Sequence, residues 1–316
     1  MAPFMEEKQR MVNPMQRREF LKLAGFGGVV FASSLAGFPR RATADTSVAT
    51  VDTQDFHFVQ MSDSHWGYEG PNNPDMQVTL PKAVEAVNKL SLQPDFIVFT
   101  GDLTHTTDDP YERRIRLKEF KQIAGKLKVK NVYFMPGEHD AGLDFGTAYQ
   151  EVFGATWYTF EYKGVHFIAL DNVSDPRGLG DQQLAWLETH LKTLDPEARI
   201  VVFSHRPLFD LFPQWEWATR DGAKAIDLLM PFQNVTAFYG HIHQENHHMT
   251  GHIAHHSAKS LAWPLPAPGS KPKPKPLPWN AAQPYDGLGV RGVTATAAPV
   301  AYDLIELPLA KGGKVS

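Results

Sequence analysis

The sequence predicts an α/β fold in which β-sheets are covered by helices. From Phe56 onward, short apolar runs of strand length alternate with amphipathic stretches of helical length, and short turns join them. Five of the apolar runs are followed closely by Asp, Glu or His side chains. Ligand sites in open α/β sheets form outside the carboxyl ends of strands, so the same pattern also predicts a functional site.

The first half of the domain is predicted to alternate strand and helix. Three β-rich apolar runs predict strands at 56–61, 96–100 and 132–135. Apolar residues at helical spacing predict helices at 77–90, after Pro74, and at 111–127.

The second half begins with a predicted hairpin, residues 157–162 and 165–170, joined by Lys163-Gly164. A helix is expected at 181–191, because Leu184, Leu187 and Leu191 share one face. Further strands are expected at 199–203, 235–239, 253–257 and 301–307.

A proline-rich stretch interrupts this alternation at about 263–290. Seven prolines between Pro264 and Pro278 exclude a regular helix or a central strand. The Lys-Pro alternation at 271–276 favours an extended polyproline-like loop, either a solvated spacer, which we favour, or a partner-binding segment. We therefore expect one domain over residues 45–316 with a long late excursion.

Residues 1–44 have the pattern of a twin-arginine signal peptide. Arg17-Arg18 precedes an apolar run at 23–38, and Ala42-Thr43-Ala44 offers small residues for cleavage. An amphipathic helix or a membrane anchor is the alternative, but the run is too short and too rich in Gly and Ser for a stable span. The expectation is a periplasmic or otherwise exported protein that uses the twin-arginine machinery.

Composition limits the chemistry. The chain contains no cysteine, so any metal must be held by nitrogen and oxygen ligands, and 14 histidines are available. Residues 1–44 carry seven Lys and Arg and three Asp and Glu, which leaves 24 basic and 32 acidic residues and a net charge of −8. So acidic a chain has no global electrostatic attraction for nucleic acid or an anionic membrane.

Five short motifs supply metal-ligand side chains in a fixed order. They are Asp63-Ser64-His65, Gly101-Asp102, Gly137-Glu138-His139-Asp140, Ser204-His205 and Gly240-His241-Ile242-His243. The two residues of the pairs Asp63/His65 and His241/His243 are two apart, so on extended segments both would point the same way. Each residue alone fits a cap, a turn or a satisfied core group, but the ordered set predicts a dinuclear metal hydrolase.

The motifs resemble those of the calcineurin-like metallophosphoesterase superfamily, over about 56–259 plus the strand near Leu304. The resemblance implies a four-layer α-β-β-α sandwich of two mixed β-sheets flanked by helices. It implies that Asp63, His65 and His243 hold one metal, that His205 and His241 hold the other, and that Asp102 bridges them. The catalytic residue is then His139, placed beside the leaving-group oxygen.

The implied activity is that of a metal-dependent phosphoric ester hydrolase acting on a small phosphomonoester or phosphodiester. Two metals about 3.5–4 Å apart activate a hydroxide and neutralise the phosphoryl charge. Imidazole and carboxylate ligands suit two divalent or mixed-valence ions of iron, manganese or zinc. His139 would protonate the departing alkoxide as general acid.

Glu138 departs from the family pattern, which has Asn at this ligand position. Glu adds a negative charge, which favours a trivalent ion or weakens attraction for a phosphate dianion. The sequence therefore leaves an alternative function, a periplasmic metal- or ligand-binding protein with weak or no phosphoesterase turnover. On these grounds alone, Glu138→Asn is predicted to raise turnover.

Two weaker signals remain. The loop 207–220 contains Phe209, Phe212, Trp215 and Trp217, and its aromatic rings either grip a substrate or pack against one another. Five further histidines follow the last motif: His247, His248, His252, His255 and His256. They form either an extra metal site or, as we favour, scattered positions on hairpin faces.

Overall fold

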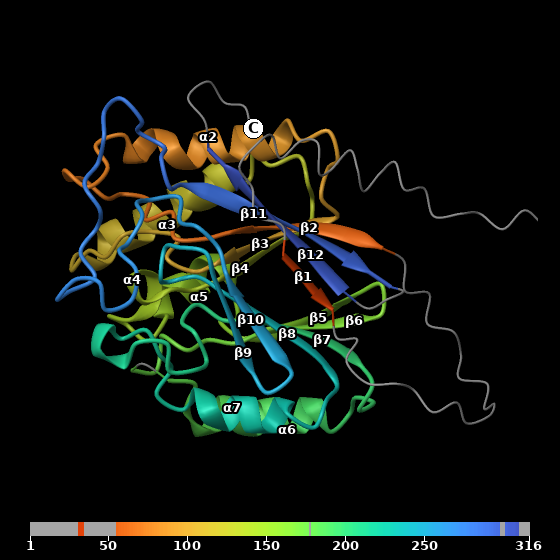
Figure 1. Cartoon of the computed structure of the whole chain (residues 1–316). Coiled ribbons are helices and arrows are strands. Elements are labelled where there is room, and N and C mark those ends of the chain that lie inside the picture. The colour runs from red at the N-terminus through yellow and green to blue at the C-terminus, as the bar shows by residue number, and fades with distance from the viewer. Residues whose placement is uncertain (1–30, 35–54, 177, 298–300, 310–316) are drawn as a thin grey trace, which may run out of the picture.

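Two β-sheets pack face to face, and helices cover both outer faces (Figure 1). This arrangement comes from a computed structural model that describes residues 31–34, 55–176, 178–297 and 301–309. The predicted four-layer α-β-β-α sandwich is confirmed.

The first sheet has the strand order β1-β12-β11-β2-β3-β4. Its strands are, in that order, Phe31–Ser34, Ala301–Pro308, Gly289–Thr296, Phe56–Met61, Phe96–Thr100 and Val132–Met135. β2, β3 and β4 are parallel, whereas β11 pairs antiparallel with both β2 and β12. The sheet is therefore mixed.

The second sheet has the order β5-β6-β7-β8-β10-β9. Its strands are Tyr158–Tyr162, Val165–Ala169, Arg199–Phe203, Asn234–Tyr239, Ile253–Ser257 and Asn246–Thr250. The four central strands run parallel, and both edge strands, β5 and β9, are antiparallel to their neighbours.

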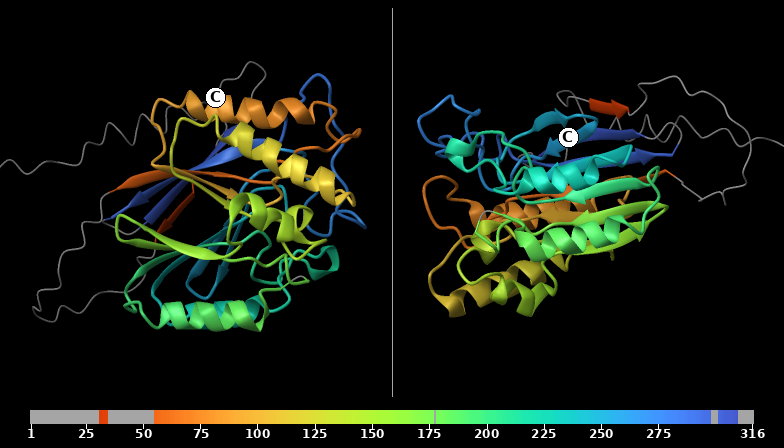
Figure 2. Two further views of the ribbon diagram at one scale, coloured as in Figure 1. Left: turned by 180° about the vertical axis from the view of Figure 1, so that it is seen from behind. Right: turned by 90° about the horizontal axis from the view of Figure 1, so that it is seen from below.

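Helices form the two outer layers, as the views in Figure 2 show. The helices α2 (Met76–Asn88), α3 (Pro110–Ala124) and α5 (Thr147–Phe153) pack on the first sheet. The helices α6 (Gly180–Leu191) and α7 (Gly222–Leu229) pack on the second. The four-residue helix α4 (Glu138–Ala141) follows the end of β4, and a 3-10 turn covers Pro213–Trp215.

An aromatic core holds the two sheets together. Alternate residues of β2 face opposite ways, so Phe56 and Phe58 point between the sheets while Val59 and Met61 face the helices. The Phe58 ring stacks on Phe96, with 4.9 Å between their centroids. Because both faces of β2 are covered, the strand has apolar residues on both faces, and His57 and Gln60 are its two polar members.

The structure contains elements that the sequence pattern did not predict. β9 was missed because its residues, Asn246–Thr250, are mostly polar, as an exposed edge strand allows. β11 was also missed. It begins at Gly289, at the end of the stretch expected to be irregular, and Gly289 and Gly292 weaken its apolar signal. α4, α5 and α7 were also missed, since each has eight residues or fewer and offers little periodicity.

Residues 263–288 contain neither helix nor strand, as the prolines predicted. Within the predicted export segment only β1 is described, and it pairs antiparallel with β12 at the edge of the first sheet. Arg17 and Arg18 lie outside the described residues. Across the described ranges, no helix combines the length and apolar character that a membrane crossing requires.

Candidate metal centre

All five motifs lie at or just beyond the ends of strands, as predicted. Asp63, Asp102 and Glu138 follow β2, β3 and β4 of the first sheet, while His205 and His241 follow β7 and β8 of the second. The centre therefore lies where the ends of both sheets meet.

The seven predicted ligands form two groups that share one residue. Within each group the ligand atoms lie within 4.8 Å of one another. The first group is Asp63, His65, Asp102 and His243, and the second is Asp102, Glu138, His205 and His241. The shared carboxylate is the one that the family resemblance implies as a bridge. Asp63, His65 and His243 fall in the first group and His205 and His241 in the second, as the resemblance implies. Glu138 falls in the second group.

Hydrogen bonds to backbone carbonyls fix the orientation of two imidazoles. His205 Nδ1 donates to the Thr100 carbonyl oxygen at 2.7 Å, and His243 Nδ1 donates to the Trp263 carbonyl oxygen at 2.7 Å. In the neutral ring the other nitrogen then carries a lone pair. In both residues Nε2 faces the ligand groups, which is the usual arrangement of metal-binding histidine.

Several polar atoms in the centre approach closely without forming hydrogen bonds. His205 Nε2 lies 2.9 Å from Glu138 Oε2, yet among the described residues neither atom has a hydrogen-bond partner. His241 Nε2 is likewise buried without one. By contrast, His65 Nε2 and His243 Nε2 lie 3.2 Å apart, within hydrogen-bond distance of each other. Electron-rich atoms that converge in this way fit bound cations, so the residues present suit a dinuclear metal site.

The backbone of the ligands is left-handed rather than extended. Asp63, His65, Asp102, His241 and His243 have φ angles between 43° and 66°. The expectation of extended ligand segments was therefore wrong, because these residues lie in tight turns beyond their strands. Residues outside glycine rarely adopt this conformation, and strain of this kind concentrates at functional sites.

Left-handed turns separate the two members of the last motif. His241 belongs to the second group and His243 to the first, although they are only two residues apart.

Gly137 allows the neighbouring turn to close tightly, since a Cβ at this position would lie 2.1 Å from Asp102 Oδ1. Gly137 is therefore required by the close packing of its turn against the turn that carries Asp102.

His139 lies beside the two groups with its ring oriented by Thr106. The Thr106 backbone N–H donates to His139 Nδ1 at 3.3 Å, and the Thr106 hydroxyl lies 2.6 Å from the same nitrogen. A nitrogen that accepts hydrogen bonds leaves the ring proton on Nε2. His139 Nε2 lies 3.9 Å from Asp102 Oδ2, so the proton is held at the metal centre.

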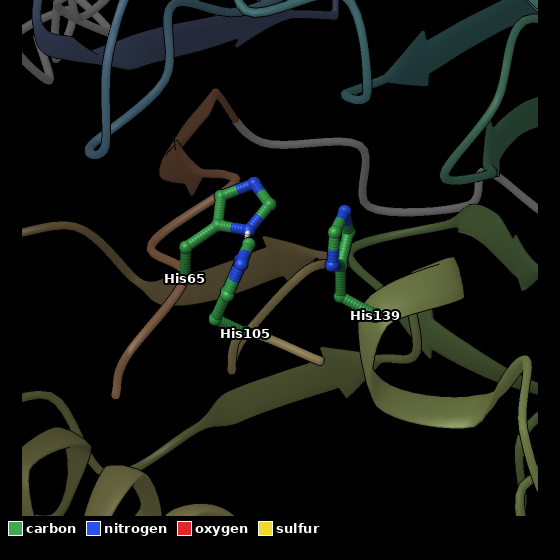
Figure 3. A group of neighbouring side chains, drawn as sticks. All are labelled: His65, His105 and His139. Atoms are coloured by element: carbon green, nitrogen blue, oxygen red, sulfur yellow. Dashed lines mark hydrogen bonds between the residues drawn. The ribbon is translucent and has the colours of Figure 1, made fainter. Parts of the chain in front are cut away.

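A third histidine accompanies His139. The ring of His105 stacks on His139 at 4.8 Å, and its Nδ1 lies 3.1 Å from His65 Nδ1 (Figure 3). The three histidines come from the turns after β2 and β3 and from α4. His105 belongs to none of the five motifs, although it stands only three residues after Asp102 in the same strand-end turn.

A cavity of about 530 Å³ opens over the centre. Its floor includes His65, Asp102 and Glu138, and its far wall comes from two segments to which the sequence assigned no firm role. One is the turn 214–217, and the other is the proline-rich run 272–276, which contributes Lys273. Trp263 joins them to the floor, because its ring stacks on His65 with 4.7 Å between centroids.

The family model of the calcineurin-like phosphoesterases matches this chain over residues 56–245. The chain belongs to that family. The predicted family and the predicted enzyme class, a metal-dependent phosphoric ester hydrolase, are confirmed at this level. The twin-arginine signal, the metal identity and the roles of individual residues stay predictions.

Curated relatives of this family member are distant. It is 29% identical over 164 residues to a probable glycerophosphodiester phosphodiesterase of Arcobacter nitrofigilis, covering 47% of this chain and 56% of that protein. It is 30% identical over 184 residues to the serine/threonine-protein phosphatase CPPED1 of Danio rerio, covering 51% and 60%. The match thus spans less than two thirds of either relative.

Solved structures share the fold. A dimetal phosphatase from Danio rerio aligns with a TM-score of 0.52 at 14% identity, covering 81% of this chain and 99% of the other. The purple acid phosphatase PPD1 from yellow lupin aligns with a TM-score of 0.58 at 16% identity, covering 84% and 53%. At such identities the likeness shows the architecture of the family alone.

The electrostatics of this phosphoesterase-family site are strongly perturbed. Burial lowers the pKa of His205, but the charges of Asp102 and Glu138 outweigh burial and hold it well above its usual value. Burial opposes ionisation of Glu138 too, and the positive charges of His241, Arg206 and His205 hold its pKa well below the usual range. His65 differs, since burial lowers its pKa well below the usual value against the charge of Asp102.

The two weaker sequence signals are resolved differently. Trp215 and Trp217 are only 7% and 1% exposed, and their rings meet edge to face. Together with Phe209 they belong to the core of the second sheet, while the two tryptophans also line the cavity. The five later histidines form no further metal-binding group among the described residues. His247 and His256 instead contact each other across β9 and β10.

Proposed function

We propose that this chain is an exported metal-dependent phosphoesterase that hydrolyses a phosphomonoester or phosphodiester with two metal ions. Asp63, His65 and His243 would hold one ion, Glu138, His205 and His241 the other, and Asp102 both. When bound, the ions supply Lewis-acid activation and neutralise phosphoryl charge. The nitrogen and oxygen donors suit iron, manganese or zinc.

The observation that supports this proposal most strongly is the pair of four-membered ligand groups joined through Asp102. The names of the relatives, a probable phosphodiesterase and a phosphatase, support phosphoester chemistry without choosing between diester and monoester. His139 holds a proton on Nε2 beside the shared carboxylate, where a general acid for the leaving oxygen is needed.

Two segments around the cavity would orient the substrate. The run 272–276 presents Lys273, the one lysine or arginine among the described residues that line the cavity, and the turn 214–217 presents Glu216. A lysine ammonium at the mouth favours an anionic ester over a neutral one. Trp263 covers His65 and limits access of bulk water to that side of the centre.

Export is proposed from Arg17-Arg18 and the apolar run that follows. Replacing both arginines by lysine should retain the protein in the cytoplasmic fraction of a bacterium that has the twin-arginine pathway. Unchanged appearance in the periplasmic fraction would count against this route.

Glu138 supports a second candidate function, a metal- or ligand-binding protein with little turnover. The fold accommodates other roles, since GAP50, the anchor in the inner membrane complex of Plasmodium, aligns with a TM-score of 0.57 at 14% identity. The two candidates differ in turnover rather than in metal content.

Elemental analysis combined with assays on aryl phosphate mono- and diesters separates these functions. The enzyme should contain about two metal ions per chain. Asp102→Asn should reduce that metal content and should lower kcat/KM by about 100-fold. Asp108→Asn, at an exposed position outside the groups, serves as the control. Two retained metals without hydrolysis of either ester class would favour the binding protein instead.

A further inference from the structure

Arg206 is a buried arginine directly behind the second ligand group. It is 5% exposed, and its Nε lies 3.5 Å from Glu138 Oε2. Within the described residues, Nε and Nη1 have no hydrogen-bond partner. Asn172 clamps the backbone, accepting from Arg206 N–H at 3.2 Å and donating to its carbonyl oxygen at 2.9 Å. Its guanidinium lies between two carboxylates, because Nη2 is 3.8 Å from Oε2 of the more exposed Glu216.

The charges in the centre explain why a cation is needed there. Asp63, Asp102 and Glu138 bring three carboxylates into two adjoining groups, and two of them share the second group. Like charges this close disfavour ionisation unless a positive charge offsets them. Arg206 supplies a charge that cannot be lost by deprotonation. It does not line the cavity, so it reaches the centre through Glu138.

We propose that Arg206 is the charge partner of Glu138, and that this pair sets the charge and the metal affinity of the second ligand group. The inference rests on the proposed metal centre, but not on turnover. It assigns Arg206 as a positioning residue that makes a carboxylate acceptable at this ligand position. It also revises the sequence-based expectation for Glu138→Asn, because this change alone removes the nearer and more buried of the two carboxylates beside the guanidinium.

A double-mutant cycle tests the pair with Glu138→Gln, Arg206→Met and the double variant. In metal-free protein each single change should lower the Tm, because it removes a nearby opposite charge from a buried charged group. The double variant should lose less than the sum of the two shifts. Arg206→Lys, which keeps the charge, should restore part of the loss that Arg206→Met causes.

Metal retention against a chelator provides the second readout. Glu138→Gln should weaken retention at one of the two sites by about tenfold or more. Arg206→Met should strengthen it by about tenfold, since a positive charge near the cation is removed. The double variant should return towards the wild-type value. A purely structural arginine would instead weaken retention in every variant that lacks it.

Arg199→Met is the matched control. Arg199 is also buried, at 6% exposure, but it lies at the other end of β7 beside the ring of Tyr302. Its Tm shift should add to that of Glu138→Gln. Additive shifts for Arg206 would overturn the proposal, as would a raised KM with unchanged metal retention, which would place Arg206 on the substrate. A wild-type protein that binds metal without turnover refutes the enzyme, whereas the metal-free Tm cycle still decides the pair.

Discussion

Single residues prepare this centre before any ion binds. Backbone carbonyls orient His205 and His243, and left-handed turns aim Asp63 and Asp102 at a common point. Fixing these side chains in advance reduces the conformational entropy that binding must overcome. Thr106 likewise orients the ring of His139, which keeps the ring proton on Nε2, and this contact can be tested by mutation.

Thr106→Val should lower kcat about tenfold, a modest part of what a general acid typically contributes. The valine keeps the shape of the side chain but removes the hydroxyl that lies 2.6 Å from His139 Nδ1. Steady-state kinetics on an aryl phosphate should show little change in KM, and elemental analysis should show unchanged metal content.

Thr106→Ser should recover most of the lost kcat, because it restores the hydroxyl. Thr107→Val at the neighbouring, half-buried position is the control. If Thr106→Val left kcat and its pH profile unaltered, the orientation of His139 by Thr106 would not matter for turnover.

At the scale of elements, strands and helices bring the ligand turns together. β2, β3 and β4 are adjacent and parallel, so their turns meet at one edge of the first sheet. The chain from Asp102 towards β4 passes through α3, whose first turn is capped by Asp109. A stable start to α3 therefore helps to hold the 102–109 turn, which carries His105 and Thr106.

Asp109→Ala should lower stability by about 1 kcal/mol, the usual cost of removing a helix N-cap. The Asp109 carboxylate accepts hydrogen bonds from Tyr111 N–H at 2.8 Å and Glu112 N–H at 3.3 Å. Thermal unfolding measures the loss as a lower Tm. Asp108→Ala removes an adjacent exposed carboxylate without removing the cap, and an equal loss in that variant would refute the capping role.

At the scale of the whole molecule, the layered sandwich buries groups that must stay neutral. His255 lies on β10 against the ring of Phe209, with 5.0 Å between centroids. Burial, assisted by His248, lowers its pKa from 6.5 to about 3. The unfolded chain therefore binds a proton between these values that the folded chain does not bind. This part of the stability is complete above pH 6.5 and is lost progressively as the pH falls towards 3.

His255→Gln should reduce the acid sensitivity of the fold. At pH 5, protonation of the unfolded wild-type His255 costs about 2 kcal/mol of stability, and glutamine has no such proton uptake. Denaturant unfolding at pH 7 and pH 5 should show a smaller decrease for the variant. Between pH 7 and pH 8 the difference between the two proteins should stay constant. Equal losses from pH 7 to pH 5 would mean that His255 is not a source of acid lability.

The sequence by itself determined the alternation of strands and helices, the strand-end positions of the motifs and the identities of the seven ligand candidates. These follow from local periodicity and from side-chain chemistry, which a single chain segment already contains. Strands at Phe56–Met61 and Phe96–Thr100 were predicted to the residue. Edge strand β9 was not, because its polar residues carry no pattern without the neighbour that it pairs with.

Only the tertiary structure decided the turn geometry that brings the ligands into the two groups implied by the family resemblance. His241 and His243 were expected to point the same way, but left-handed turns send them to different groups. Arg206 and Lys273 gave no signal, since their importance depends on Glu138 and on the cavity, which other parts of the chain supply. The five motifs therefore identify the family from sequence, whereas the charge balance of its centre arises from contacts between segments far apart in the chain.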